Sequence, residues 1–185
     1  MPDSTAASPF ANPAGEARDA AQGYVRALLD LLGDREPLAV VAATPAALAG
    51  AVAGLDAERL HRPERPGKWS LAEVLAHLAD SDLVWGYRLR RVLAEERPTL
   101  TGYDQDAWAA RLHYRDARVA DSLALFGALR AANLRLVRAT TPADLQRVGV
   151  HSERGEESVT HLLALYAAHD LVHLRQIERI KAAVG

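Results

Sequence analysis

The segment from Ser70 to Glu95 constrains the fold most, because it predicts one long amphipathic helix with a defined start. Ser70 and Glu73 have the spacing of a capping box, in which each side chain accepts a hydrogen bond from the other residue's backbone N–H. The Pro- and Gly-containing segment RPERPGK before them is typical of a loop. Apolar residues at helical spacing follow on one face: Val74, Leu78, Trp85, Leu89 and Val92.

The composition indicates that the partners of this helix are also helices. Ala makes up about a fifth of the chain, and β-branched or aromatic runs are scarce, which favours helix over strand. We expect further helices at about residues 16–33, 36–54, 104–112, 117–139 and 158–183.

Together these segments predict an all-α protein, a four-helix bundle with long connecting loops and a short extra helix at 104–112. The bundle would consist of 36–54 and the three long helices. Thr44 and Pro45 mark either an N-cap with a first turn or a kink. The segments 16–33 and 36–54 are therefore either two helices or one bent element.

The chain length of 185 residues suits one domain. We expect a disordered N-terminal arm over residues 1–15 and a single helical-bundle domain over 16–185. The arm has an early acidic residue and no apolar stretch, so it does not resemble a secretory signal. The uncharged run from Pro37 to Leu55 is too rich in Ala, and too interrupted by Gly and Pro, for a membrane span.

The charge balance and the lack of cysteine limit the possible functions. The chain has 22 Lys and Arg against 24 Asp and Glu, a net charge of -2, which argues against binding nucleic acid or an anionic membrane. We expect a small-molecule partner or another protein. The absence of Cys excludes disulfides, thiolate metal sites and a Cys nucleophile, and it fits a cytoplasmic location. Any thiol chemistry would need a thiol from another molecule.

His169 and His173 lie four residues apart within the apolar stripe of the last predicted helix. This spacing places both imidazoles on one helix face, where they are either metal ligands or two core histidines. The pair is not the HExxH motif of zinc proteases, because Asp170 stands where that motif has Glu. No His or Asp follows His173, so a third ligand has to come from upstream.

His77 is the strongest upstream candidate, because it lies at the edge of the stripe on the capped helix. The alternative is that it pairs locally. Three histidine ligands with an open position are typical of a catalytic metal site. For the other histidines we expect structural or surface roles, with solvent exposure for His61, His113 and His151, and His161 too far along its helix to share the ion.

Two arginines, Arg88 and Arg130, fall in apolar helix stripes. A buried guanidinium needs an anion, which is either an internal carboxylate, with Glu73, Asp80, Asp82 and Asp170 available, or the carboxylate or phosphate of a substrate. Trp108 on the short extra helix is a candidate for the wall of a pocket.

The motifs GKWSLAEVLAHLADSD, YRLR, ALR, HSERGEE and HDLVHLRQI, in this order, resemble the DinB-like family of damage-inducible and YfiT-like bacterial proteins. The resemblance covers about residues 37–184. It implies a four-helix bundle with a divalent metal ion, usually zinc or nickel, held by His77, His169 and His173. It also implies, for members with an assigned activity, a thiol S-transferase using bacillithiol, mycothiol or glutathione, or a related isomerase, and frequent homodimers.

Three functions follow as hypotheses. The leading one is a metal-dependent thiol S-transferase of detoxification or stress response, in which Arg88 or Arg130 orients an anionic group of the thiol. The second is a metal-dependent hydrolase, with Asp170 or Asp80 as a base or as a partner that orients an imidazole. The third is a non-catalytic metal-binding stress protein.

Overall fold

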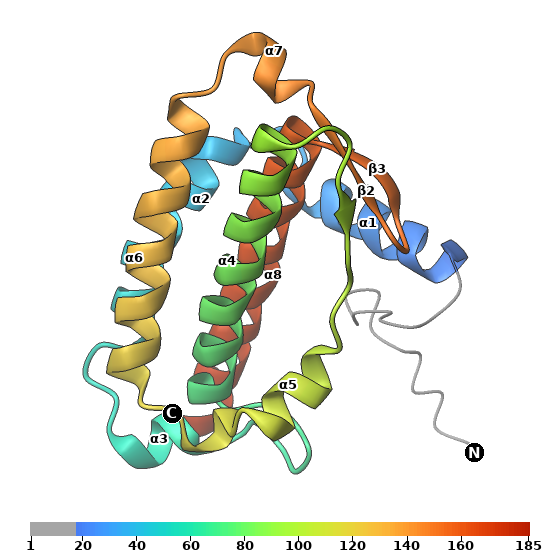
Figure 1. Cartoon of the computed structure of the whole chain (residues 1–185). Helices are drawn as coiled ribbons and strands as arrows, with labels where there is room; N and C mark the ends of the chain where they lie inside the picture. The colour runs from blue at the N-terminus through green and yellow to red at the C-terminus, as the bar shows by residue number, and fades with distance from the viewer. Residues whose placement is uncertain (1–17) are drawn as a thin grey trace.

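The computed structural model describes residues 18–185, so the predicted arm over residues 1–15 lies outside the described part. Helices dominate this part, as predicted, and one small sheet accompanies them (Figure 1). The elements in chain order are α1 (Arg18–Leu32), α2 (Pro37–Val52), α3 (Ala57–His61), α4 (Leu71–Ala94), β1 (Thr99–Leu100), α5 (Gln105–Arg111), the 3-10 helix η1 (Tyr114–Asp116), α6 (Val119–Arg138), α7 (Pro142–Leu145), β2 (Val148–His151), β3 (Gly155–Ser158) and α8 (Val159–Val184).

Four helices, α2, α4, α6 and α8, form the bundle (Figure 1). Helix α4 packs against α6 and α8, and α2 packs against the same two helices, so the four close into a ring. This confirms the predicted all-α four-helix bundle. Helix α1 packs against α8. It ends before Gly33, whose φ of 55° is left-handed, so α1 and α2 are two helices rather than one bent element.

Helix α2 runs through Pro45, and its N-cap is Glu36, which excludes the N-cap as one of the two alternatives for Thr44 and Pro45. Proline has no N–H to donate to the carbonyl four residues earlier, which here is that of Val41. Arg130 on α6 donates to this free carbonyl oxygen at 2.8 Å. The proline thus provides a buried acceptor that a neighbouring helix uses.

The three-stranded sheet was not predicted. Strand β1 pairs in parallel with β2, and β2 pairs antiparallel with β3. The segment HSERGEE, predicted as a polar loop, contains the end of β2, the turn and most of β3. The sheet ties the connection after α4 to the hairpin before α8, and Figure 1 shows it on the same side of the bundle as α1.

The bundle core is divided by a layer of polar side chains. One apolar cluster contains Trp85, Leu134 and Leu162, and the other contains Leu75, Phe126 and Ile177. On each of the four helices buried or half-buried polar groups lie between the two clusters, and His77 on α4 lies one turn before them, among residues of the second cluster. We call this set the polar layer; it comprises Thr44, His77, Ser81, Asp82, Arg130, Asn133, His169, Asp170 and His173.

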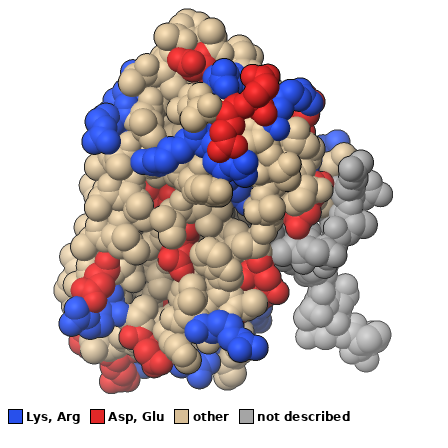
Figure 2. All heavy atoms as spheres, viewed as in Figure 1, with Lys and Arg blue, Asp and Glu red and all other residues tan. Residues whose placement is uncertain are grey.

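On the face shown in Figure 2, basic and acidic side chains are interspersed and gather mainly towards the two ends of the bundle. No broad basic surface is visible on that face. Within residues 18–185, no helix is both long and apolar enough to cross a membrane.

Candidate metal centre

The structure brings His77, His169 and His173 together inside the polar layer. The Nε2 atom of His169 lies 3.3 Å from that of His77 and 3.1 Å from that of His173. One ligand nitrogen from each of the three rings lies within 4.8 Å of the other two. Three imidazoles from two helices therefore point their ring nitrogens at one place.

The start of α4 fixes the position of His77. The Ser70 hydroxyl accepts from the Glu73 backbone N–H at 3.3 Å, and the Glu73 carboxylate accepts from the Ser70 N–H at 2.8 Å. The predicted capping box is therefore present. His77 lies about two turns further on and is 1% exposed, and the Trp69 ring packs 5.0 Å from its imidazole.

The start of α8 is fixed in a similar way, because the Ser158 hydroxyl accepts from the His161 backbone N–H. His169 and His173 follow on one face, as their spacing predicts, with ring centroids 4.4 Å apart. His173 is buried and His169 is half-buried. The pair faces His77, since α4 packs against α8.

The nitrogen positions fit a small divalent cation. With Zn–N bonds of about 2.0–2.1 Å, tetrahedral geometry separates two ligand nitrogens by about 3.4 Å. The two Nε2 separations of 3.3 and 3.1 Å are close to this value. A second feature agrees: Gln176 Oε1 lies 2.8 Å from His173 Nδ1. An amide oxygen only accepts, so the His173 proton is on Nδ1 and the Nε2 lone pair is free for a metal.

Burial keeps all three imidazoles neutral near pH 7. It lowers the pKa of His169 to about 4, with the charge of Arg130 adding to the effect. It lowers the pKa of His173 to about 3, with His169 as the second cause, and the pKa of His77 to well below its usual value. Neutral imidazoles are the form that binds metal ions.

A cavity of about 70 Å³ opens beside His77 and His169. From His77, a chain of polar contacts runs along its wall: Ser81 Oγ lies 3.4 Å from His77 Nε2 and 3.0 Å from the Tyr103 hydroxyl. Burial raises the pKa of Tyr103 far above its usual value, so the phenol stays protonated. The remaining walls are formed by Tyr24, Leu28, Arg88, Gln105, Arg154, Leu165 and Tyr166.

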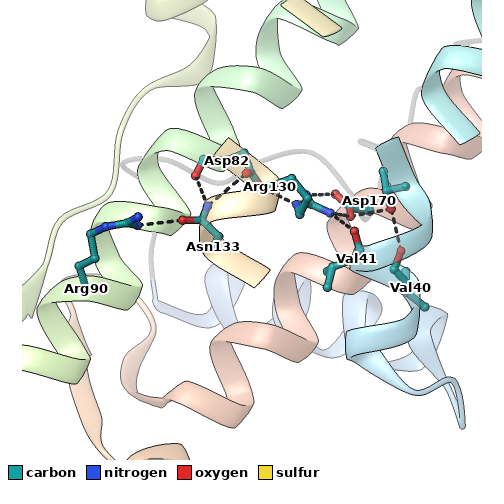
Figure 3. Close-up of polar contacts among 8 residues, drawn as sticks. Val40, Val41, Asp82, Arg90, Arg130, Asn133 and Asp170 are labelled. Carbon is teal, nitrogen blue, oxygen red and sulfur yellow. Dashed lines mark hydrogen bonds and ion pairs between the residues drawn. The ribbon is translucent and has the colours of Figure 1, made fainter. Parts of the chain in front are cut away.

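Among the arginines predicted to bind substrate, Arg88 lines the cavity and Arg130 does not. Arg130 lies in the bundle interior, 1% exposed, where Asp170 accepts from its Nη1 at 2.6 Å and from its Nη2 at 3.1 Å. Asp82 accepts from its Nε at 2.8 Å (Figure 3). The internal ion pair, one of the two alternatives for a buried arginine, is therefore the one found for Arg130.

The two carboxylates considered as a base also have other partners. Asp170 accepts from the Thr44 hydroxyl at 2.8 Å in addition to Arg130. Asp80 accepts from the Tyr114 hydroxyl at 2.5 Å. Neither lines the cavity. Trp108, expected in a pocket wall, packs behind it against Tyr103, with the ring centroids 4.5 Å apart.

Several residues of the site were not identified from the sequence. Gln176 has a simple signal, because it follows His173 by three residues on the same helix face. Arg154 has none, since it lies in a segment with the composition of a loop. His151, which does not line the cavity, was expected to be exposed, but it is 2% exposed because it lies at a buried position of β2.

Comparison with known proteins places the chain in a family. The model of the DinB superfamily matches residues 41–177. "Putative metal-dependent hydrolase" of Geobacillus thermodenitrificans is 32% identical over 153 residues, which cover 82% of this chain and 85% of that protein. "Putative metal-dependent hydrolase OB0782" of Oceanobacillus iheyensis is 34% identical, over 72% of this chain and 77% of the relative.

A solved structure shows the same fold. YfiT from Bacillus subtilis, described as a probable metal-dependent hydrolase with an unusual four-helix bundle topology, superposes with a TM-score of 0.74. The two chains are 29% identical, and the match covers 79% of this chain and 84% of YfiT. The bundle, the motif order and the family match agree, and the chain belongs to the DinB superfamily.

Proposed function

We propose that this protein is a metal-dependent thiol S-transferase, which uses a low-molecular-weight thiol of the bacillithiol type in detoxification or stress response. One observation carries the proposal: the cavity beside the three converging Nε2 atoms is lined by two arginines and, among residues 18–185, by no carboxylate. A site of this kind suits a nucleophile that needs no protein base and a co-substrate that carries negative charge.

The three histidines would hold the metal ion, and the donor set of neutral imidazoles suits zinc or nickel. A divalent cation at this position supplies Lewis acidity, which lowers the pKa of a thiol or a water molecule that it binds. Gln176 would keep His173 in the tautomer that presents Nε2.

The choice of a thiol over water follows from the surroundings of the histidines. A free thiol has a pKa of about 8.5, so a modest lowering gives the thiolate at neutral pH. Metal-bound water has a pKa of about 7, and hydrolases commonly place a carboxylate or histidine base beside it to take up its proton. The two candidate bases, Asp170 and Asp80, are bonded elsewhere and lie outside the cavity wall.

Calorimetric titration of bacillithiol into zinc-loaded protein tests the proposal. We expect saturable binding to the wild type and none to His77→Ala, which lacks one of the three imidazoles. A matched control is His61→Ala, because His61 is exposed and lies on α3, which does not line the cavity. Heat signals that are the same for wild type and His77→Ala would contradict the proposal.

A metal-dependent hydrolase is the second candidate, and the names of the relatives favour it. In this version Tyr103 and Ser81 would orient the substrate, since they are the polar side chains next to His77. Turnover of ester or amide panels by the zinc-loaded protein without any thiol would favour the hydrolase. Turnover of electrophiles only with added thiol would favour the transferase.

Homodimer formation and a cytoplasmic location stay predictions. Light scattering of the purified protein measures the first. A mass of about one chain across the working concentration range would contradict it.

A further inference from the structure

The inference concerns the end of the cavity away from the histidines, where Arg88 and Arg154 lie. Arg88 is 5% exposed, and its guanidinium donates to the Thr101 carbonyl oxygen and to the Tyr166 hydroxyl. A guanidinium has five N–H donors, so most of its capacity is unused. Within the described chain it makes no ion pair with a carboxylate, unlike Arg130 in the polar layer.

Arg154 from the β2–β3 turn reaches the same cavity. Its Nε and Nη2 atoms donate to the buried carboxylate of Glu157, at 2.5 and 3.1 Å. This ion pair neutralises Arg154. The charges of Arg88, Arg154 and Glu157 therefore sum to one uncompensated positive charge in a buried place, and a buried charge without a counter-ion is strongly unfavourable.

His151, at the end of β2 just before the turn that carries Arg154, is a buried histidine. Its Nδ1 accepts from the Glu153 backbone N–H at 3.2 Å, so its proton is on Nε2. Nε2 is buried and has no partner among the described residues. Burial, together with the nearby charges of Arg154 and Arg88, lowers the pKa of His151 to about 3, so the imidazole is neutral and adds no charge.

We propose that Arg88 and Arg154 form a carboxylate subsite, which binds the acid group of a small molecule whose other end reaches the three histidines. One uncompensated positive charge matches a monoanion, so a carboxylate fits better than a phosphate dianion. The inference rests on the proposed function only for the thiol end of the ligand.

The helix geometry sets the length of this ligand. Arg88 follows His77 by eleven residues on α4, which is about three turns, so both side chains are on nearly the same face. The two Cα atoms are about 16 Å apart along the axis. Side chains of a helix lean towards its N-terminus, so the long Arg88 side chain returns towards His77 and shortens the gap. We choose a probe with six carbon atoms in all, in which five methylene groups separate the carboxylate from the thiol.

The experiment compares 6-mercaptohexanoate with 6-mercaptohexanol by calorimetric titration into zinc-loaded protein. We expect the acid to bind at least about ten-fold more tightly, because charged hydrogen bonds to Arg88 are added. The preference should fall to within about two-fold in Arg88→Met. Arg135→Met is the matched control, since it removes an exposed arginine of α6, and it should keep the preference.

A second arm uses hexanoate and the metal-free protein, and it separates the subsite from the proposed function. We expect saturable hexanoate binding by wild type that is lost in Arg88→Met. Hexanoate binding without any thiol binding would overturn the transferase and keep the subsite. Thiol binding with equal affinities of acid and alcohol would overturn the subsite and keep the transferase. Hexyl phosphate that binds more tightly than hexanoate would overturn the assignment to a monoanion.

Arg88→Lys covers the case in which Arg88→Met does not fold. Lysine keeps the positive charge but lacks the planar guanidinium group. We therefore expect its preference for the acid over the alcohol to be weaker than that of wild type and stronger than that of Arg88→Met. Circular dichroism checks that each variant is folded. An unchanged preference in a folded Arg88→Lys protein, together with an unchanged preference in Arg154→Gln, would overturn the subsite.

Discussion

Two polar clusters lie in the same cross-section of the bundle, and they differ in how their polar atoms are satisfied. The cluster around Arg130 is closed: Asp82 and Asp170 accept from its guanidinium, and Asn133 donates to Asp82 while accepting from Arg90 (Figure 3). Its charges cancel. The histidine cluster is open, because His77 Nδ1 has no partner among the described residues and the Nε2 atoms of the three rings have mainly one another as neighbours.

This difference indicates that, within the polar layer, the Arg130 cluster stabilises the fold and the histidine cluster binds a ligand. Burying polar groups is tolerated when every donor and acceptor is paired, and the Arg130 cluster meets this condition. It also demands close packing, since a Cβ on Gly86 would lie 2.5 Å from Asn133 Oδ1. The histidine cluster does not meet the condition with protein atoms alone. An outside ligand would complete it.

The largest expected effect on the free energy of unfolding comes from a substitution in the closed cluster. Arg130→Met leaves the carboxylates of Asp82 and Asp170 buried without their cation. We expect the free energy of unfolding to fall by about 3–5 kcal/mol, measured by urea denaturation at pH 7. Arg135→Met, at an exposed site of the same helix, should change it by less than about 0.5 kcal/mol. Similar small losses in both variants would show that the Arg130 cluster is not structural.

The open cluster should respond to metal instead. We expect zinc at 100 to 1,000 times its Kd to raise the free energy of unfolding of the wild type by about 3–4 kcal/mol. The gain should disappear in His77→Ala and persist in Arg130→Lys, whose side chain does not line the metal site. Elemental analysis of the same samples gives the metal content. Equal metal content in wild type and His77→Ala would remove His77 from the site.

A smaller effect is expected from Gln176, the residue that orients His173. We expect Gln176→Ala to weaken zinc binding by about ten- to a hundred-fold, the usual range for a partner of a metal ligand. The measurement is competition with a zinc chelator of known affinity. Gln146→Ala, at an exposed position, is the control. Unchanged affinity in Gln176→Ala would mean that the orientation of His173 is set by packing alone.

The smallest expected effect is on how the free energy of unfolding depends on pH. Asp82 and His151 contribute to this dependence with opposite signs. In the closed cluster, burial raises the pKa of Asp82 from 3.8 to about 6, with Arg130 opposing. A raised folded-state pKa contributes stability that is fully present below pH 3.8 and is lost as the pH rises through 6. Near the cavity, the pKa of His151 is lowered from 6.5 to about 3. Its contribution is present above pH 6.5 and is lost as the pH falls towards 3.

Variants at these two positions should therefore change the acid sensitivity in opposite directions. Between pH 7 and pH 5, Asp82→Asn should lose more stability than wild type, because the gain from protonating Asp82 is removed. His151→Gln should lose less. The quantity measured is the change in the free energy of unfolding between pH 7 and pH 5. We expect it to differ between each variant and wild type by about 1 kcal/mol. Identical pH profiles of the two variants would contradict both assignments.

The sequence predicted the parts of the molecule that depend on local spacing. The capping box at Ser70, the i,i+4 pair His169 and His173 and the apolar stripes depend on neighbours within one helix, and the structure has each of them. The convergence of His77 with that pair required only that two such helices pack face to face.

The parts that depend on distant partners could not be derived from spacing. Whether Arg130 binds Asp82, Asp170 or a substrate is decided by how three helices meet, and no local pattern encodes this. The sheet was missed because its strands are short and β3 is the polar sequence GEES. Without the sheet, neither the burial of His151 nor the entry of Arg154 into the cavity could be foreseen.

The capping box has a consequence for how the length of this chain can vary. Ser70 defines where the helical count of α4 begins, and His77 is reached seven residues later. One residue inserted between them would turn the imidazole by about 100° and move it about 1.5 Å along the axis. The same insertion in the loop before Ser70 would leave the count unchanged. The chain can therefore vary in length before Ser70 without moving His77, but a change of length between Ser70 and His77 would displace the imidazole from the site.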